Sequence, residues 1–375
     1  MILRYLAIPI GIGAAFLLLW LMWPSPIDPV SWEEPRAPEL AEPIAPNDAL
    51  RAAVIDRIDM PGAARGVAVS TDGMVYFGTP SGDIMRLRTG ISDGEIRPEL
   101  VAHIIDDGIF GLGWIDESTL GIAAAGGLYS LHLTSRTVET LSTGATTRAF
   151  GNISNLAVAP DGRIFFTDSS RRWDQSSRRP GYYYDMLENR PNGAVYVWDP
   201  ESGRTTPVRD RLYYPNGVAM ASDGQSIFVT ETFRYRIQRI WVAGPRAGEM
   251  DIFAKNLPGL PAGIANDGEG HLVVAMLTRR SNLLALVHRN PGLTRILIKL
   301  PQWLRPNDST PLAFILRLNE SDGRFRDAFH DPDSSLDYLS TVTVGPEGEI
   351  WFGSAFGGLV GRYDPAEPAG TPEDR

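Results

Sequence analysis

The 375-residue chain contains no cysteine. This absence excludes disulfides, thiol catalysis and thiolate metal sites, although it does not identify the compartment. The chain is also short of positive charge, since 35 Lys and Arg residues stand against 45 Asp and Glu residues. No basic stripe is present to neutralise phosphates, so the composition argues against nucleic acid as a partner. The sequence also lacks a G-x-S-x-G elbow and a P-loop, and therefore gives no support to a serine hydrolase triad or a phosphate-cradling loop.

What the sequence does contain is a recurring phrase: a small or polar start, alternating apolar residues, a turn rich in Asp, Glu and Gly, and a second β-rich run. Period-two alternation on both sides of such a turn indicates a β-hairpin, and repetition at about 45 residues is typical of propeller blades. We therefore predict an all-β, six-bladed β-propeller over residues 51–365. The six copies lie at 66–79, 111–124, 155–168, 216–231, 263–276 and 340–354.

Two intervals between the repeats are too long for a bare blade. The extra residues fall at 170–190, which is rich in Arg and Tyr, and at 278–312, which reads as a helical insertion in the fifth blade region. Insertions in repeat arrays usually map to loops on one face, often the binding face. We expect them to form lids or walls over a site, although the apolar and basic stretch 281–305 also suits a helix lying in a membrane interface.

Residues 5–23 run for 19 positions without a charge, close to the length needed to cross a bilayer. We interpret residues 1–24 as a transmembrane signal anchor; a cleavable signal peptide is the alternative, but no small-x-small cleavage site follows. Arg4 precedes the span, whereas Asp28, Glu33 and Glu34 follow it. The positive-inside rule then places the N-terminus in the cytoplasm and the propeller on the extracytoplasmic side, periplasmic or lumenal.

Residues 25–50 are rich in Pro and Glu, which predicts an extended tether, and residues 366–375 are expected to form a disordered tail. In a propeller, the start of the first strand and the end of the second strand of each blade share one face. Counting from the turns places polar side chains at this end of the channel, and their oxygens suit a hard cation or a polar small molecule. These side chains are Arg65, Asn155, Asp168, Asn216, Glu231 and Thr341.

Several phrases resemble the strictosidine synthase-like group, which includes the adipocyte plasma membrane-associated proteins and is related to gluconolactonases, regucalcin and paraoxonases. The resemblance covers about residues 25–364 and also implies a six-bladed propeller. The phrases that carry it are SPIDPVSW (25–32), FFTDSSRRW (165–173), YYPNGVAM (213–220), ETFRYRIQRIWV (231–242), NLPGLPAGI (256–264) and FHDPDSSLDYLSTV (329–342).

The resemblance implies a central divalent cation, usually Ca²⁺, which lactonase relatives hold with a Glu, Asn residues and an Asp. Asn155 and Asn216 match the two asparagines, but Arg65 stands in place of the Glu and Ala262 in place of the Asp. Two neutral amides beside an Arg make a poor Ca²⁺ site. We expect an altered metal site in which Arg65 occupies part of the cation's place.

The resemblance supports two functions. The first is hydrolysis of lactones or esters, as in lactonases and arylesterases, with Arg65, Asp168, Glu231 and His330 as catalytic candidates. Asn155, Asn216 and Thr341 then bind the small-molecule substrate. The second is a non-catalytic propeller that binds a small molecule or a partner. Strictosidine synthase itself uses a catalytic Glu where this chain has Thr341, which argues against Pictet–Spengler condensation.

Overall fold

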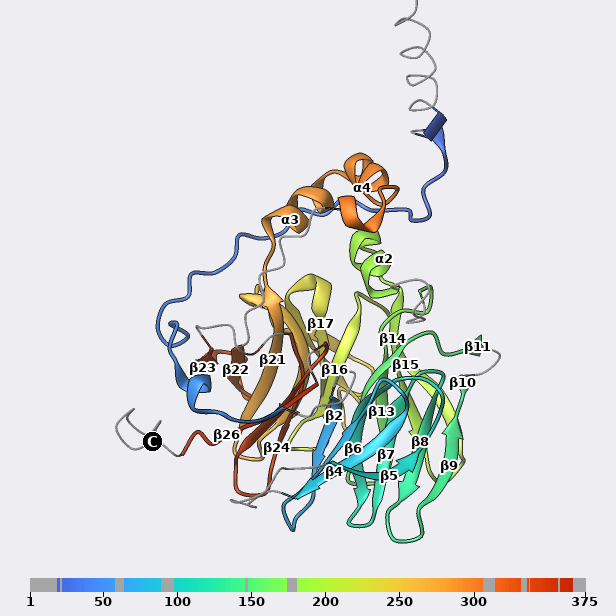
Figure 1. Cartoon of the computed structure of the whole chain (residues 1–375), viewed down its shortest axis with the longest axis vertical. Helices are drawn as coiled ribbons and strands as arrows, with labels where there is room; N and C mark the ends of the chain where they lie inside the picture. The colour runs from blue at the N-terminus through green and yellow to red at the C-terminus, as the bar shows by residue number, and fades with distance from the viewer. Residues whose placement is uncertain are drawn as a thin grey trace, which may run out of the picture.

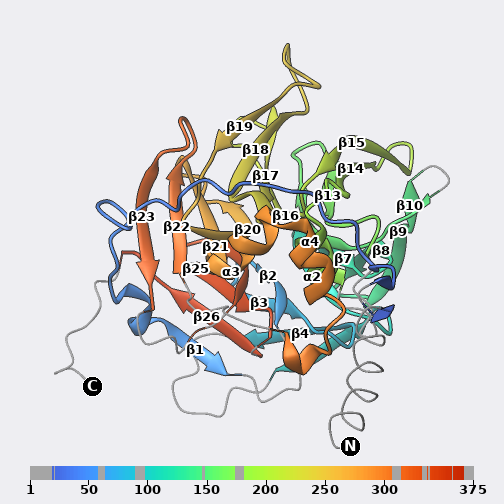
Figure 2. The same cartoon turned by 90° about the horizontal axis from the view of Figure 1, so that it is seen from above.

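The chain forms six four-stranded antiparallel sheets arranged around a central axis, which confirms the predicted six-bladed propeller (Figures 1 and 2). The computed structural model describes residues 19–20, 22–57, 64–88, 98–145, 148–173, 181–305, 314–331, 336, 338–356 and 358–366. From the axis outward, the first five blades are formed by β2–β5, β6–β9, β12–β15, β16–β19 and β20–β23. The sixth contains β24, β25, β26 and β1, so the N-terminal strand closes the ring against the C-terminal blade.

The strands have the following bounds. In blades 1 to 3 they are β2 (Arg65–Val69), β3 (Met74–Gly78), β4 (Asp83–Arg88), β5 (Glu99–His103), β6 (Ile109–Asp116), β7 (Thr119–Ala124), β8 (Gly127–His132), β9 (Thr137–Ser142), β12 (Ile153–Val158), β13 (Ile164–Asp168), β14 (Gly193–Asp199) and β15 (Arg204–Leu212). In blades 4 to 6 they are β16 (Pro215–Met220), β17 (Ser226–Glu231), β18 (Arg236–Trp241), β19 (Met250–Ala254), β20 (Gly259–Asn266), β21 (His271–Arg279), β22 (Phe314–Asn319), β23 (Phe325–His330), β24 (Leu339–Val344), β25 (Ile350–Ser354), β26 (Leu359–Tyr363) and β1 (Val54–Arg57). A small hairpin, β10 (Gly144–Ala145) and β11 (Arg148–Ala149), lies before blade 3.

Glycines allow the six inner strands to approach one another backbone to backbone. A Cβ added at Gly66 would lie 2.8 Å from Cα of Gly111, and one at Gly111 would lie 2.8 Å from Cα of Asn155. A Cβ at Gly263 would lie equally close to Cα of Thr341. Real Cβ atoms do not tolerate such distances, so a side chain at these positions would push adjacent blades apart.

Hydroxyl groups also join neighbouring blades. Thr167 at the end of β13 donates to the Asn216 carbonyl at 2.6 Å, and Thr230 at the equivalent place in β17 donates to the Ala262 carbonyl at 2.7 Å. Each bond runs from the second strand of one blade to the first strand of the next. These bonds satisfy backbone carbonyls that the ring buries, and they fix the angle between successive blades.

Both predicted insertions are present, and each connects the second and third strands of its blade at the same end of the propeller (Figure 1). The blade 3 insertion contains α2 (Gly181–Glu188), and the blade 5 insertion contains α3 (Asn282–Arg289), α4 (Pro291–Leu297) and the short helix η3 (Gln302–Leu304). Leu187 of α2 packs with Leu284 and Val287 of α3 in one buried cluster. The two insertions therefore form a single cap on that end.

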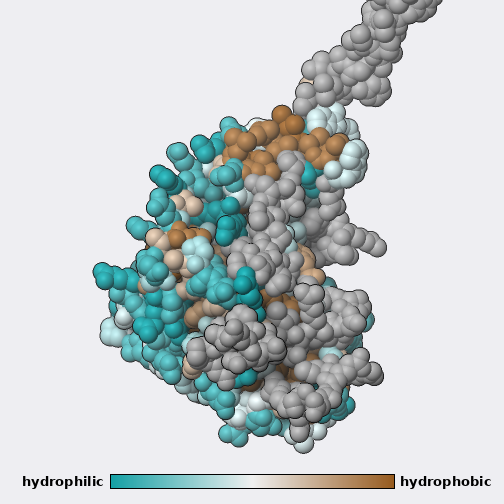
Figure 3. Space-filling model, turned by 60° about the vertical axis from the view of Figure 1, so that its left-hand side comes forward, coloured by the Kyte–Doolittle hydropathy of each residue, from teal (hydrophilic) through white to brown (hydrophobic). Residues whose placement is uncertain are grey.

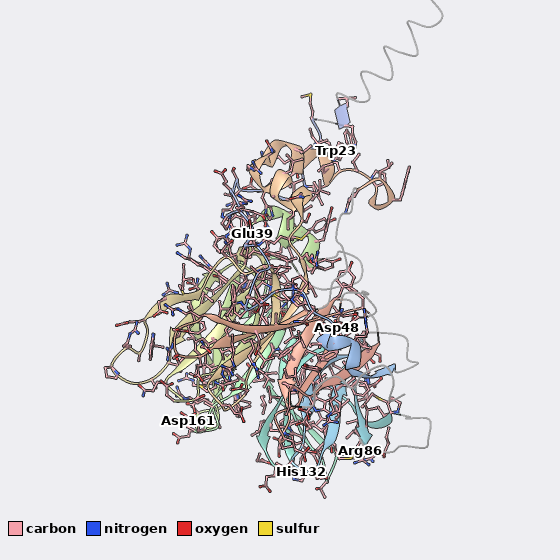
Figure 4. The ribbon with its side chains drawn as sticks, turned by 90° about the vertical axis from the view of Figure 1, so that its left-hand side faces the viewer. Trp23, Glu39, Asp48, Arg86, His132 and Asp161 are labelled. Atoms are coloured by element: carbon pink, nitrogen blue, oxygen red, sulfur yellow. The ribbon has the colours of Figure 1, made fainter. Side chains whose placement is uncertain are left out.

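Residues 24–48 contain no helix or strand, and they pack against the propeller and its cap. We call this segment the strap; in Figure 4 it runs from near Trp23 past Glu39 to Asp48. Ile27 is buried in the cap cluster, and Ile44 is buried in the core of blades 4 and 5. The strap then enters the 3₁₀ helix η1 (Ala49–Ala52) before β1. A second 3₁₀ helix, η2 (Thr232–Arg234), follows β17.

A buried histidine joins the strap to both insertions. Nδ1 of His288 in α3 lies 2.8 Å from a Glu34 carboxylate oxygen of the strap, and Nε2 lies 2.8 Å from the Met186 carbonyl of α2. The Met186 carbonyl can only accept, so Nε2 of His288 donates to it, and Nδ1 faces the Glu34 carboxylate. The Trp32 backbone N–H also donates to the His288 carbonyl at 2.9 Å.

The predicted membrane span, residues 5–23, lies outside the described residues except for 19, 20, 22 and 23. Within the described part of the chain, no helix combines the length and the apolar character needed to cross a bilayer.

Candidate functional site at the channel mouth

Asp168 is the last residue of β13 and is fully buried. Its Oδ2 accepts a hydrogen bond from the Gly151 backbone N–H at 3.0 Å, and its Oδ1 accepts one from the Asn152 backbone N–H at 2.7 Å. Burial raises the pKa of this carboxyl group, and the two backbone bonds oppose that shift. Asp168 therefore holds the loop that leads into β12 and fixes the position of Asn152.

Glu231 ends β17 and has the equivalent arrangement in blade 4. It is fully buried, and its Oε1 accepts from the Tyr213 backbone N–H at 2.7 Å. Its Oε2 accepts from Gln238 Nε2 at 2.7 Å and forms an ion pair with Arg236. The carboxylate thus fixes the loop that leads into β16, and it places the next residue, Tyr214.

The two loops held in this way meet at the mouth of the channel. Asn152 Nδ2 donates to the Tyr214 hydroxyl at 3.4 Å, and both side chains are buried. Burial raises the pKa of Tyr214, and the nearby Asp185 raises it further, whereas Asn152 and Arg65 lower it. Tyr182 raises the pKa of the Tyr214 phenol as well. We call these five residues the mouth cluster: Arg65, Asn152, Tyr182, Asp185 and Tyr214.

Arg65 begins β2, the innermost strand of blade 1. Its Nη2 donates to the Ala355 carbonyl at 3.1 Å, and its guanidinium lies 5.1 Å from the centre of the Phe110 ring. Nε is buried and has no hydrogen-bond partner among the described residues. Burial lowers the pKa of Arg65, and Tyr214 and Tyr182 oppose the shift. An uncompensated guanidinium is suited to an anionic or strongly polarised oxygen.

Asp185 lies in α2 and is buried. Its Oδ2 accepts from Ser170 Oγ at 2.6 Å and from Asn192 Nδ2 at 3.0 Å. Burial raises the pKa of Asp185 to about 7, against the effect of these two hydrogen bonds, and the neighbouring Glu188 also raises it. A carboxyl group with such a pKa can accept or donate a proton near neutral pH.

His330 lies away from these residues. It ends β23, the outermost strand of blade 5, and its ring stacks on Phe314 at 5.1 Å between ring centroids. The side chain is buried, and neither ring nitrogen has a hydrogen-bond partner in the described part of the chain. Burial lowers the pKa of His330.

The remaining predicted binding residues lie on the inner strands of blades 3, 4 and 6. Asn155 Oδ1 accepts from the Leu156 backbone N–H at 2.7 Å. Asn216 uses its backbone carbonyl in the link to Thr167, and Thr341 is buried next to Gly263. None of these three residues is part of the hydrogen-bonded pair at the channel mouth.

The donors at the channel do not fit a Ca²⁺ site, which requires six to eight oxygens including carboxylates. The Asn155 oxygen accepts a backbone bond, Ala262 offers no side-chain oxygen, and Arg65 adds a positive charge. Within the described residues, no group of three or more His, Asp or Glu side chains could hold a metal ion.

The sequence did not single out Asn152, Tyr182, Asp185 or Tyr214. Asn152 and Tyr214 precede the inner strands by one residue, and Tyr182 and Asp185 lie in the insertion that was predicted to form a wall. The available signal was the GYYYDMLE run at 181–188, in which three consecutive Tyr residues precede two acidic residues on a short helix.

Two family profiles match parts of the chain. The strictosidine synthase profile matches residues 154–245, and the strictosidine synthase-like N-terminal profile matches residues 43–87. The human adipocyte plasma membrane-associated protein (Homo sapiens) is 30% identical over 371 residues, which cover 93% of this chain and 86% of the relative. The Rattus norvegicus protein of the same name is 28% identical over 380 residues, which cover 93% and 94% respectively.

Solved structures share the fold at lower identity. A gluconolactonase from Xanthomonas campestris superposes with a TM-score of 0.59 at 16% identity, covering 91% of this chain and 98% of the other. A calcium-binding regucalcin from Agrobacterium tumefaciens gives a TM-score of 0.55 at 15% identity, covering 83% and 92%. At such identities the likeness establishes the propeller fold alone.

Proposed function

The chain belongs to the strictosidine synthase-like family, and on that premise we propose that it hydrolyses lactones or esters at the channel mouth beneath α2. The observation that carries the proposal is Arg65, a guanidinium with a buried Nε that no side chain of the described residues satisfies. It lies beside Phe110 and in the field of two phenols, where it can accept a carbonyl oxygen that becomes anionic.

In the proposed reaction, Asp185 acts as the general base. A water oxygen attacks the carbonyl carbon while its proton passes to the Asp185 carboxylate, and Arg65 stabilises the oxyanion of the tetrahedral intermediate. The bond from carbon to the leaving oxygen then breaks, and the leaving oxygen takes the proton back from Asp185. Hydrolysis of a lactone therefore yields a hydroxy acid. Its new carboxyl group releases its proton to solvent, and the resulting carboxylate pairs with Arg65. Arg65 serves in place of a metal ion throughout.

Asp168 and Glu231 support this site indirectly in the proposal, because they position Asn152 and Tyr214. Thr341 offers a hydroxyl group and no carboxylate, so the proposal does not include Pictet–Spengler condensation. The relatives' names also support membrane association for this chain. The charge-free run at 5–23 then serves as the anchor, and Arg4 on its N-terminal side favours an extracytoplasmic propeller.

The test is hydrolysis of a panel of aryl esters and lactones by the full chain and by single variants. Arg65→Met should lower kcat by about 10²- to 10³-fold, as expected for a lost oxyanion donor. Asp185→Asn should lower it by about 10²- to 10⁴-fold. Arg86→Met is the matched control, because Arg86 lies at the opposite end of the propeller and pairs with Glu99 (Figure 4). Full activity in Arg65→Met would refute the proposed chemistry.

The second candidate function is binding of a small carboxylic acid without turnover. It is favoured because both carboxylate oxygens of Asp168 and of Glu231 already accept hydrogen bonds that hold nearby loops and side chains. Few groups are then left to take part in catalysis. Calorimetry with hydroxy acids separates the two functions. Under this alternative, the wild type binds but hydrolyses nothing, and Arg65→Met loses binding whereas Asp185→Asn retains it.

A further inference from the structure

Exposed apolar side chains gather at the capped end of the molecule. More than half of the exposed large hydrophobic residues in the described part lie there, and Figure 3 shows a brown, apolar area at that end of the molecule. They include Leu286, Ile296, Trp303 and Leu304 of the blade 5 insertion, and Met22 and Trp23 at the start of the described chain. Trp303 and Met22 are each 80% exposed.

These residues form the outer side of an amphipathic unit. Leu284 and Val287 of α3 are buried against α2, whereas Leu286 of the same helix is exposed. The same division occurs in α4 and just beyond it, where Thr294 and Ile298 are buried and Ile296 is exposed. Packing against the propeller therefore satisfies one side of the insertion only. The other side has no covering element among the described residues.

The charge of this surface is opposite to that of the whole chain. Residues 279–305 contain six Arg and Lys residues and no Asp or Glu, although the formal charge of the protein is −10. Asp28 of the strap pairs with Arg295 and with Arg190, which neutralises part of the positive charge. Lys299 lies 6.0 Å from the centre of the Trp20 ring, so the basic insertion adjoins the end of the charge-free run at 5–23.

We propose that this face, which we call the docking face, lies in the headgroup region of an anionic phospholipid bilayer. Exposed Trp and Leu side chains next to Arg and Lys are the features that hold a helix in the interface plane. A second copy of the chain is a poorer occupant, because two such basic surfaces would repel each other. The inference does not depend on the hydrolase proposal, and it is separate from the anchor, which only tethers the domain.

Docking in this way would place α2 and the channel mouth beside the lipid surface, because both insertions form one cap. The absence of cysteine makes the idea directly measurable, since a single introduced cysteine is a unique labelling site. Leu304→Cys, at 49% exposure, reports on the docking face. Ile252→Cys on β19, also at 49%, is the matched control on the side of blade 4.

Each full-length variant is spin-labelled and reconstituted in nanodiscs with anionic or purely zwitterionic lipid. In anionic nanodiscs, the label at 304 should be several-fold more accessible to oxygen, which concentrates in lipid, than to a water-soluble nickel complex. The label at 252 should show the reverse preference. Adding Arg289→Glu, a change at an exposed position, should shift the label at 304 towards nickel accessibility.

Two outcomes would overturn the proposal. In the first, the label at 304 is as accessible to nickel as the label at 252 in both lipids, so the domain is tethered but not docked. In the second, the label is shielded from both reagents with or without lipid, which would mean that protein, such as a second copy, covers the face.

Discussion

The contact between strap and cap can be broken by one substitution, Glu34→Ala. The Glu34 and His288 side chains are 5% and 0% exposed, and Nδ1 of His288 lies 2.8 Å from a Glu34 carboxylate oxygen. Removing one partner of a buried pair costs about 3–5 kcal/mol, because the other partner is left desolvated and unpaired. The Trp32 and Val30 backbone bonds to the cap remain, so we expect the weakened strap to detach transiently more often while the propeller stays folded.

Trypsin cleavage after Arg36 measures this detachment. The Arg36 side chain is 92% exposed, but the backbone is held, since the Arg36 carbonyl accepts from Asn256 at 3.1 Å and the Pro35 carbonyl accepts from Arg280 at 2.8 Å. Cleavage therefore requires the strap to open. When opening is fast relative to cleavage, the rate follows the open population, and a cost of 3 kcal/mol corresponds to about a hundredfold increase.

The control is Glu39→Ala, which removes an exposed strap carboxylate 3.9 Å from Arg36. An exposed pair contributes about 0–1 kcal/mol, so cleavage should change by no more than a few fold. Glu34→Gln should fall between the two, because its amide can still hydrogen-bond to Nδ1 of His288. Equal cleavage rates for Glu34→Ala and Glu39→Ala would refute the reasoning.

Three further predictions concern the propeller itself. The pKa of Asp185 is raised to about 7, so the native protein keeps a proton that the unfolded chain releases near pH 4. Stability should therefore fall as pH rises from about 4 to about 7. Asp185→Asn should make the melting temperature depend less on pH over that range, and parallel curves of melting temperature against pH for variant and wild type would contradict this. Gly111→Ala should destabilise the ring by about 1–3 kcal/mol in urea denaturation, whereas Gly292→Ala, with open space around it, should not. Asp168→Asn should cost about 1–3 kcal/mol, because an amide cannot accept from both backbone N–H groups; an unchanged urea midpoint would show that the loop is held by other contacts.

The propeller could be predicted from the sequence because each blade carries its own signal. Period-two alternation and a turn such as Asp72-Gly73 act within about 14 residues, and the structure has a positive φ at Gly73, as such a turn requires. The positions of both insertions followed from the intervals between turns. The blade count and the capped end therefore needed no long-range information.

The candidate site depends on contacts that repeats do not encode. Counting within the hairpins located Asp168 and Glu231 at equivalent positions, and they do have equivalent environments. Their equivalent positions in the repeat could not show that both carboxylates accept hydrogen bonds from backbone N–H groups of the loops that lead into their own blades. The position of α2, which carries Asp185, depends on how this helix packs against α3 and the strap, and no local pattern specifies that packing.

The strap was predicted as a tether because Pro and Glu suppress periodicity, yet four apolar residues within it are buried or packed. Ile27 and Ile44 are each at most 3% exposed, and Trp32 and Leu40 pack against the core of blades 4 and 5. Single apolar residues spaced along an extended segment produce no period that a sequence pattern can detect. Their burial depends on the surface that the rest of the chain builds.

The architecture explains why the candidate site, the strap and the docking face all occur at one end. Contacts between blades run through the inner strands, so the connection from second to third strand can lengthen without disturbing the ring. At the other end, the first two strands of most blades are joined by tight turns with positive φ at glycines such as Gly73, Gly162 and Gly348. Arg86, His132 and Asp161 mark that end in Figure 4, opposite Trp23. Short polar turns have too few residues to form a pocket. The insertions at the capped end, in contrast, contain both buried ionisable groups and an apolar surface. Under the two proposals made above, hydrolysis and membrane docking therefore both fall at the capped end.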